Sequence, residues 1–221
     1  MTRLAEWKRS SGPALGHNAG KKAIDVSLSL ALIIILAPLL LLLCFLVRAT
    51  SAGPALFRQE RVGRNMRPFT MLKMRTMCTD NDDSIHREYM TRMLSVGQHG
   101  AGPDGLFKLV CDPRVTPLGR WLRRSSLDEL PQLFNVLRGD MSLVGPRPVL
   151  PWEVRLFGPE YQHRFQVKPG ITGLWQVSGR SRLSMRQALE LDVEYALRHT
   201  LALDLIIILR TVPAVLRGGA R

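Results

Sequence analysis

An uninterrupted apolar run near the amino terminus constrains the fold of this chain more than any other feature. Residues 26–47 read VSLSLALIIILAPLLLLLCFLV and contain no charged side chain. A helix of this length can cross a bilayer core of about 30 Å. The run is too long for the core of a signal peptide, and no clear small-residue cleavage site follows it. A buried helix of a soluble domain would rarely be apolar on every face. The run therefore predicts a membrane segment.

Two features of this segment argue against a simple crossing, although composition alone makes spanning the default. Pro38, near the middle, removes a backbone hydrogen bond and favours a kink. Both flanks are basic, and positively charged flanks favour the cytoplasm. A helix that breaks at Ala37 and Pro38 and returns to the same face would place both flanks there. The flanking cations are Arg3, Lys8, Arg9, Lys21 and Lys22 before the run, and Arg48, Arg58, Arg61, Arg64, Arg67, Lys73 and Arg75 after it.

The charge balance points to an anionic partner. The 221 residues include 31 Lys and Arg against 18 Asp and Glu, a formal net charge of +13. Such an excess fits nucleic acid, acidic lipid or a phosphorylated substrate. Cys44, Cys78 and Cys111 show no pairing or metal-ligand spacing, which predicts a reducing compartment. The length suffices for one globular domain, or for a smaller domain with a membrane element.

Short elements separated by Gly and Pro loops fill the rest of the chain. Residues 1–20 lack periodicity and predict a mobile tail. Residues 55–61 and 67–74 predict two short strands joined by VGRNM. Residues 97–105, GQHGAGPDG, predict a loop.

Helical patterns dominate the second half. A short basic helix is expected over residues 120–125, and a further helix ends near Gly139. Ser184 and Gln187 match a capping box that begins another helix. The strongly apolar residues 201–216 fit either a buried helix or one lying in the membrane interface.

Asp128 and Glu129 form an acidic pair directly before an apolar helical run, and local pattern favours a structural role for them. Ser126 and Glu129 have capping-box spacing. Alternatively, Asp128 is itself the N-cap, which places Pro131 in the first turn. Either arrangement sets negative charge against the positive end of the helix dipole.

The surroundings of this pair favour chemistry as well. Two stiff loops, GPRP at 145–148 and KPGITG at 168–173, each carry a cation and can aim backbone N–H groups at phosphate oxygens. Carboxylates in such a setting can hold Mg²⁺ or attack phosphorus to form an acyl phosphate. Beside a membrane segment, this combination suggests phosphoryl chemistry on a lipid-borne substrate. The neighbouring arginines are Arg114, Arg120, Arg123, Arg124, Arg138 and Arg147.

Four long motifs resemble the bacterial sugar transferases, the monotopic phosphoglycosyltransferases that begin exopolysaccharide and glycan assembly. The resemblance runs from about Lys21 to Val215. The motifs are FRQERVGRNMRPFTMLKMRTM, DPRVTPLGRWLRRSSLDELPQLFNVLRGDMSLVGPRPVLPWE, VKPGITGLWQVSGR and LDVEYALRHTLALDLIIILRTV.

This resemblance implies an α+β fold, mostly helical with a small β-hairpin. Residues 21–49 are expected to form a re-entrant membrane helix-break-helix, and residues 50–221 a cytoplasmic catalytic domain with amphipathic helices at the membrane interface. The implied location is the cytoplasmic face of the bacterial inner membrane. The family often breaks its membrane helix at Ser-Pro. Ala37-Pro38 departs from that pattern and lacks the hydroxyl that could bond the freed carbonyl.

The resemblance also implies a reaction: transfer of a sugar 1-phosphate from a nucleotide sugar, expected to be a UDP-sugar, to polyprenol (undecaprenyl) phosphate, with release of the nucleoside monophosphate. Asp128 would attack the sugar-bearing phosphate and form a covalent adduct, while Glu129 assists with Mg²⁺ or protons. Asp128 and Glu129 are the implied metal ligands. The implied phosphate or nucleotide contacts are Arg123, Arg147, Lys168 and Arg180.

Lys73 and Asp192 also match positions that the family needs, and both are expected to be catalytic. Without the resemblance, Lys73 would be taken for an exposed edge lysine. Asp192 would be taken for a solvated helix position or an i,i+4 partner of a basic residue.

Two functions of other classes compete with the transferase. A membrane-tethered nucleic-acid binder fits the net charge, but the sequence has no zinc pattern, RNP-like motif or stacking-aromatic series, so no nucleic-acid partner is expected. An inactive scaffold of an export complex is the second, and the intact acidic pair argues against it. Anionic membrane lipids are expected partners, a homo-oligomer is left open, and the sequence does not name the sugar.

Overall fold

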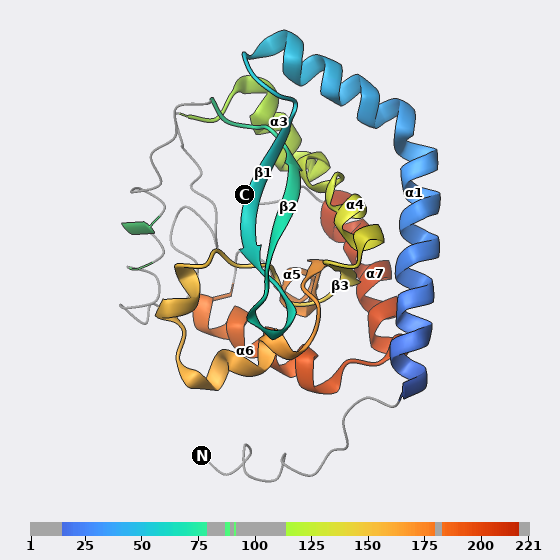
Figure 1. Cartoon of the computed structure of the whole chain (residues 1–221), viewed down its shortest axis with the longest axis vertical. Coiled ribbons are helices and arrows are strands. Elements are labelled where there is room, and N and C mark those ends of the chain that lie inside the picture. The colour runs from blue at the N-terminus through green and yellow to red at the C-terminus, as the bar shows by residue number, and fades with distance from the viewer. Residues whose placement is uncertain (1–14, 79–86, 89–90, 92–113, 180–182, 217–221) are drawn as a thin grey trace.

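The longest element is the helix α1, Leu15–Thr50, which runs along one side of the molecule and bends over its top (Figure 1). The computed structural model describes residues 15–78, 87, 88, 91, 114–179 and 183–216. The loop predicted at 97–105 and most of the tail predicted at 1–20 lie outside these residues. Residues 15–20 of that predicted tail are helical and belong to α1.

The backbone of α1 remains helical through Ala37 and Pro38, so the described segment is one bent helix rather than two helices with a gap between them. Its length and composition are sufficient to cross a membrane. Its course relative to a bilayer stays a prediction. Large apolar side chains are exposed along both halves of it: Val26, Leu30, Ile34, Ile35, Leu41, Leu42 and Phe45.

Polar contacts hold the first turns of α1 against the rest of the chain. Lys21 Nζ donates to Asp204 Oδ2 at 2.8 Å and to the Val144 carbonyl at 3.0 Å. The buried carboxylate of Asp25 accepts from the Leu143 N–H at 3.0 Å and from the Ser142 hydroxyl at 3.1 Å. Lys21 is therefore a paired, mostly covered cation as well as part of the basic flank.

The other end of α1 is capped by a side chain from the domain. Arg75 is buried, and its Nη2 donates to the Ser51 carbonyl at 2.7 Å and to the Val47 carbonyl at 3.3 Å. The last carbonyls of a helix lack partners within the helix, and a cation there also complements the dipole. Both ends of the apolar segment are thus attached to the domain.

The predicted hairpin is confirmed. β1, Leu56–Val62, pairs antiparallel with β2, Pro68–Met74, in a register that sets Leu56 opposite Met74. The short 3₁₀ helix η2, Arg64–Met66, closes the turn, with Asn65 at φ 56°. Asparagine tolerates this left-handed conformation better than most residues.

Short helical elements follow the hairpin, and several match the sequence prediction. α3 contains the predicted basic helix and is capped by Thr116, α4 ends at the left-handed Gly139, and the capping box of Ser184 and Gln187 is formed. These elements are α3, Pro117–Ser125; η3, Leu127–Glu129; α4, Gln132–Arg138; η4, Glu153–Leu156; η5, Pro159–Gln166; α5, Leu174–Ser178; α6, Met185–Arg198; and α7, Leu201–Leu216.

A second, parallel strand pair joins the two Gly/Pro loops, and the sequence prediction missed half of it. β3, Ser142–Val144, pairs with β4, Gly170–Thr172. The motif VKPGITGLWQVSGR also predicts a short strand, which is β4, whereas the sequence predicts no strand at β3. Three residues are too few to show a strand periodicity, so only the tertiary pairing defines β3.

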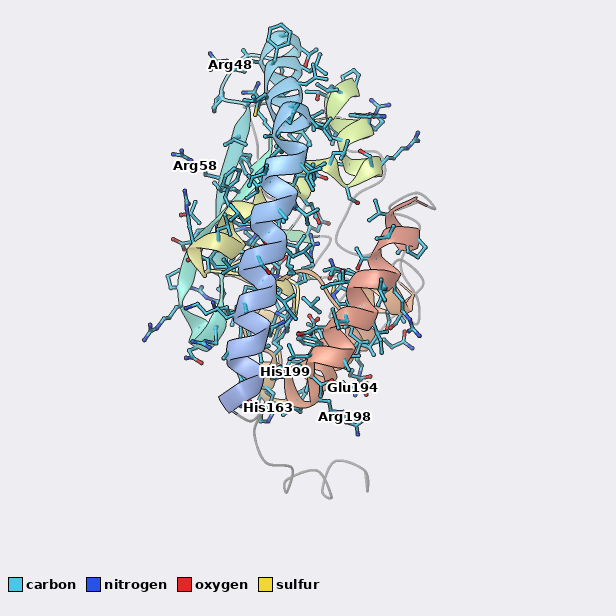
Figure 2. The ribbon with its side chains drawn as sticks, turned by 90° about the vertical axis from the view of Figure 1, so that its right-hand side faces the viewer. Arg48, Arg58, His163, Glu194, Arg198 and His199 are labelled. Atoms are coloured by element: carbon cyan, nitrogen blue, oxygen red, sulfur yellow. The ribbon has the colours of Figure 1, made fainter. Side chains whose placement is uncertain are left out.

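α7 is buried on one face and exposed on the other. Ile207 belongs to the core cluster that also includes Met71, Val144 and Tyr195. Leu205, Ile206, Leu209 and Val212 remain exposed, and α7 lies beside α1 in both views (Figures 1 and 2). The packed face agrees with the buried-helix alternative for residues 201–216, and the membrane-interface alternative for the exposed face stays a prediction.

Candidate active site

The acidic pair lies in a single 3₁₀ turn, η3, between α3 and α4. Ser126 ends α3 in a left-handed conformation with φ 57°, and its side chain makes no capping hydrogen bond to η3. α4 begins only at Gln132, with Pro131 at its N-cap position. Both capping predictions are therefore wrong. An N-cap residue is typically extended, and Ser126 is held out of that conformation by closing the preceding helix.

The two carboxylates differ in exposure. Asp128 is only 3% exposed, whereas the Glu129 side chain is 16% exposed and lines a cleft. Asp128 is not among the residues that line this cleft.

Lys73 meets Glu129 across the cleft. Its Nζ lies 3.2 Å from Glu129 Oε1, and both side chains are 16% exposed. Lys73 is therefore not the exposed edge lysine that local pattern alone would indicate. A cation held against a carboxylate in the lining of a cleft can contact an anionic ligand that enters it.

Asn135 sets the spacing between this lysine and the acidic turn. It is fully buried on α4, and its side-chain amide pairs with the free edge of β2. Its Oδ1 accepts from the Leu72 N–H at 2.9 Å, and its Nδ2 donates to the Thr70 carbonyl at 2.7 Å. An edge strand otherwise leaves such groups unpaired. The contact fixes α4, and with it the turn before α4, beside Lys73.

The two Gly/Pro loops pack against each other, and both contribute residues to the lining of the cleft. Gly145 and Gly170 pack backbone against backbone, and a Cβ added to Gly170 would lie 2.1 Å from the Gly145 nitrogen. No side chain fits at such a contact. The residues that line the cleft are Arg61, Met71, Lys73, Glu129, Gln132, Arg147, Pro148, Gly170, Ile171 and Gln176.

Three of the four predicted substrate-binding residues are described by the structure, and of these only Arg147 lies in the lining of the cleft. Arg123 is on α3, where its Nε donates to the Thr76 hydroxyl at 3.0 Å. Lys168 lies elsewhere, with its Nζ at the end of α4, 3.5 Å from where a Cβ on Gly139 would be. Burial and the nearby charge of Arg64 lower the pKa of Lys168. Arg180 lies outside the described residues.

Asp192 is buried on α6 and is not among the residues that line the cleft. Its Oδ2 accepts from Arg164 Nη2 at 2.6 Å. Burial raises the pKa of Asp192 to about 6, although Arg164 and Arg147 oppose the rise. The structure therefore places Asp192 behind the loop that carries Arg147.

The sequence analysis assigns no site role to three polar residues that line the cleft, Arg61, Gln132 and Gln176. The sequence analysis places Arg61 only in a basic flank, and its burial beside the GPRP loop follows from tertiary packing. Gln132 and Gln176 fall inside the quoted motifs, and no charge or spacing distinguishes them from other polar positions.

Within the described residues, no group of three or more His, Cys, Asp or Glu side chains could hold a metal ion by itself. Asp128 and Glu129 offer two hard oxygen donors. Mg²⁺ is commonly held by one or two carboxylates together with substrate phosphates and water. The pair thus fits a metal shared with a phosphorylated substrate.

Comparison with known proteins agrees with this geometry. A family model described as bacterial sugar transferase matches residues 16–218. The exopolysaccharide production protein ExoY of Sinorhizobium fredii is 39% identical over 195 residues, which cover 88% of this chain and 84% of that protein. The UDP-glucose:undecaprenyl-phosphate glucose-1-phosphate transferase of Caulobacter vibrioides is 42% identical over 214 residues, covering 92% and 72%.

Some relatives are much longer. The undecaprenyl-phosphate galactose phosphotransferase of Salmonella typhimurium is 38% identical over 197 residues, and the match covers 89% of this chain but only 40% of that protein. In each of these proteins the matched region includes most of the present chain. This chain belongs to the bacterial sugar transferase family.

Proposed function

We propose that this protein transfers a sugar 1-phosphate from a UDP-sugar to undecaprenyl phosphate, releases UMP, and so begins the assembly of an exopolysaccharide. The observation that carries the proposal is the Lys73–Glu129 pair. The pair lines a cleft together with Arg147, Glu129 follows Asp128 in the same turn, and the domain is attached to an apolar helix. The relatives named for such transfers support the choice of substrates.

In the first step, the Asp128 carboxylate attacks the phosphorus that bears the sugar. The bond from that phosphorus to the bridging oxygen breaks, UMP leaves with the electron pair, and an aspartyl phosphosugar remains. Asp128 must become accessible from the cleft when substrate binds, because it is 3% exposed in the structure. Lys73 and Arg147 supply positive charge where negative charge develops on the phosphate oxygens.

Asp128 and Glu129 would hold Mg²⁺, which when bound supplies charge that neutralises the diphosphate. Lys73 keeps Glu129 oriented at the cleft.

In the second step, a phosphate oxygen of undecaprenyl phosphate attacks the same phosphorus. The acyl phosphate bond breaks, the Asp128 carboxylate is regenerated, and the sugar diphospholipid leaves. Because the acceptor resides in the membrane, the cleft must lie close to the bilayer. The exposed apolar faces of α1 and α7 are suited to that position.

We further propose that α1 re-enters the cytoplasmic face of the inner membrane, so that the protein is monotopic. Single cysteines placed near Lys22 and near Arg48, on a cysteine-free background, should both be protected from a reagent added on the periplasmic side. Efficient labelling of either position would show that α1 crosses the membrane.

The transfer itself is tested with full-length protein in a membrane mimic, undecaprenyl phosphate, Mg²⁺ and a panel of UDP-sugars including UDP-glucose and UDP-galactose. We expect release of UMP and formation of a sugar diphospholipid with at least one donor. Glu194→Gln, on the exposed face of α6 (Figure 2), is a matched control that should retain parental turnover. Salt-sensitive binding of random DNA without any transfer would refute the proposal.

A further inference from the structure

The loop that carries Arg147 is held by its carbonyl oxygens. Proline supplies no N–H on either side of Arg147 and restricts the backbone there. Each of three successive carbonyls accepts a hydrogen bond. The Gly170 N–H donates to Pro146 at 2.9 Å, Arg164 Nη2 to Arg147 at 2.8 Å, and Arg61 Nη1 to Pro148 at 3.3 Å.

Two of these donors, Arg164 and Arg61, are buried guanidinium groups, and each also lies near a buried carboxylate. Arg164 Nη2 lies 2.6 Å from Asp192 Oδ2, with side chains 1% and 3% exposed. Arg61 Nη1 lies 3.9 Å from Glu153 Oε2, and this carboxylate also accepts from the Leu150 N–H at 2.6 Å. The same arrangement therefore recurs at adjacent residues of one loop.

Arg164 is further restrained by aromatic rings. Its guanidinium carbon lies 5.3 Å from the centroid of Phe157 and 5.2 Å from that of Phe165. A cation over two ring faces is attracted to both. Burying an ion pair is costly, and such a pair adds little to stability compared with apolar packing. The buried Arg164–Asp192 pair has a use beyond stability, because Arg164 binds the backbone of Arg147, whose side chain lines the cleft.

We infer that Asp192 is a positioning residue, which acts through Arg164 to fix the backbone of Arg147 and so to aim the Arg147 guanidinium at a phosphate of the substrate. The inference rests on the proposed function and assigns Asp192 a role different from that of Asp128. Asp192 pairs with a buried arginine and does not touch the substrate.

A double-mutant cycle tests this dependence, because residues that act through one another show non-additive effects. The variants are Asp192→Asn, Arg147→Ala and the two combined, and kcat and KM are measured for the UDP-sugar. In the parent background we expect Asp192→Asn to lower kcat/KM by about 10- to 100-fold, since small misplacements of a substrate-positioning group have effects of this size. With Arg147→Ala present, the same change should cost less than about 2-fold.

Additive losses in the two backgrounds would overturn the inference, as would a loss through Asp192→Asn as complete as that of Asp128→Asn. Arg164→Lys keeps the buried positive charge and replaces Asp192→Asn in the same cycle if the latter does not fold. Glu194→Gln, on the exposed face of the same helix, should leave both constants unchanged.

Hydrogen exchange provides a readout that needs no turnover. Asp192→Asn should accelerate exchange of backbone amides in residues 145–150 while leaving the β1–β2 hairpin unchanged. If exchange in residues 145–150 were unchanged by Asp192→Asn, the inference would be overturned. This outcome does not depend on whether the proposed function is correct. If the parent protein catalyses the transfer but the double-mutant cycle is additive, the positioning role of Asp192 is rejected and the proposed function stands.

Discussion

Two cation–carboxylate pairs, both joining distant parts of the chain, differ in their access to solvent. Lys73 and Glu129 are 3.2 Å apart, each 16% exposed, at the edge of a cleft. Arg164 and Asp192 are 2.6 Å apart and almost fully buried against aromatic rings. The first pair can meet a ligand, and the second can act only through the backbone it holds. This difference in exposure is why we propose a chemical role for the first pair and a positioning role for the second.

The largest effect is expected at the acidic turn. Asp128→Asn removes the attacking negative charge, so turnover should fall by at least about 1000-fold if covalent catalysis is lost. The protein should stay folded, because Asn has nearly the same shape. UMP release measures the loss. Intact mass of the parent, incubated with UDP-sugar and no lipid acceptor, should show a sugar-phosphate adduct on the peptide that contains Asp128. Near-parental turnover of the variant would exclude Asp128 as the nucleophile.

Removal of divalent metal is expected to have the next largest effect. Excess chelator should reduce transfer to near background, because a diphosphate must otherwise approach Asp128 and Glu129 without a neutralising cation. Added Mg²⁺ should restore the rate. Replacement of Cys44, Cys78 and Cys111 is the control and should leave metal dependence intact. Full turnover in chelator would contradict the proposed metal.

A smaller loss is expected at the lysine of the exposed pair. Lys73→Met keeps most of the side-chain volume but removes the charge that faces Glu129, and kcat/KM should fall by about 100-fold. Lys73→Arg retains a cation and should recover part of the activity. If Met and Arg variants were equally impaired, the shape of the lysine rather than its charge would be the important property.

The smallest expected effect is a pH dependence of stability from the buried pair. The pKa of Asp192 is raised from its ordinary value of 3.8 to about 6 by burial. Its protonated form therefore favours folding, a contribution that is complete below about pH 4 and is lost as pH rises through about 6. The Tm of the parent minus that of Asp192→Asn should fall by several degrees across this range, since 1 kcal/mol shifts Tm by about 2–4 °C in a domain of this size. A constant difference would contradict the raised pKa.

Much of the local structure could be predicted because its causes lie within a few residues. Gly139 ends α4 because a left-handed residue is needed there, and Ser184 and Gln187 cap α6 reciprocally. The hairpin follows from two strand patterns and a turn. Ser126 shows the limit of this approach. The capping pattern is present, yet the serine closes the preceding helix and cannot also be an extended N-cap.

The sequence by itself determined the apolar segment, the short elements, and the family to which the motifs belong. Only the tertiary structure decided which charges meet. Lys73 and Glu129 are 56 residues apart, and Arg164 and Asp192 are 28 apart, so no local period relates them. The packing of α4 against β2, and of α6 against η5, brings these residues together and sets how much water reaches them. Because a charge depends on its solvation and its partners for its pKa and its role, the sequence could name these residues but could not assign what each one does.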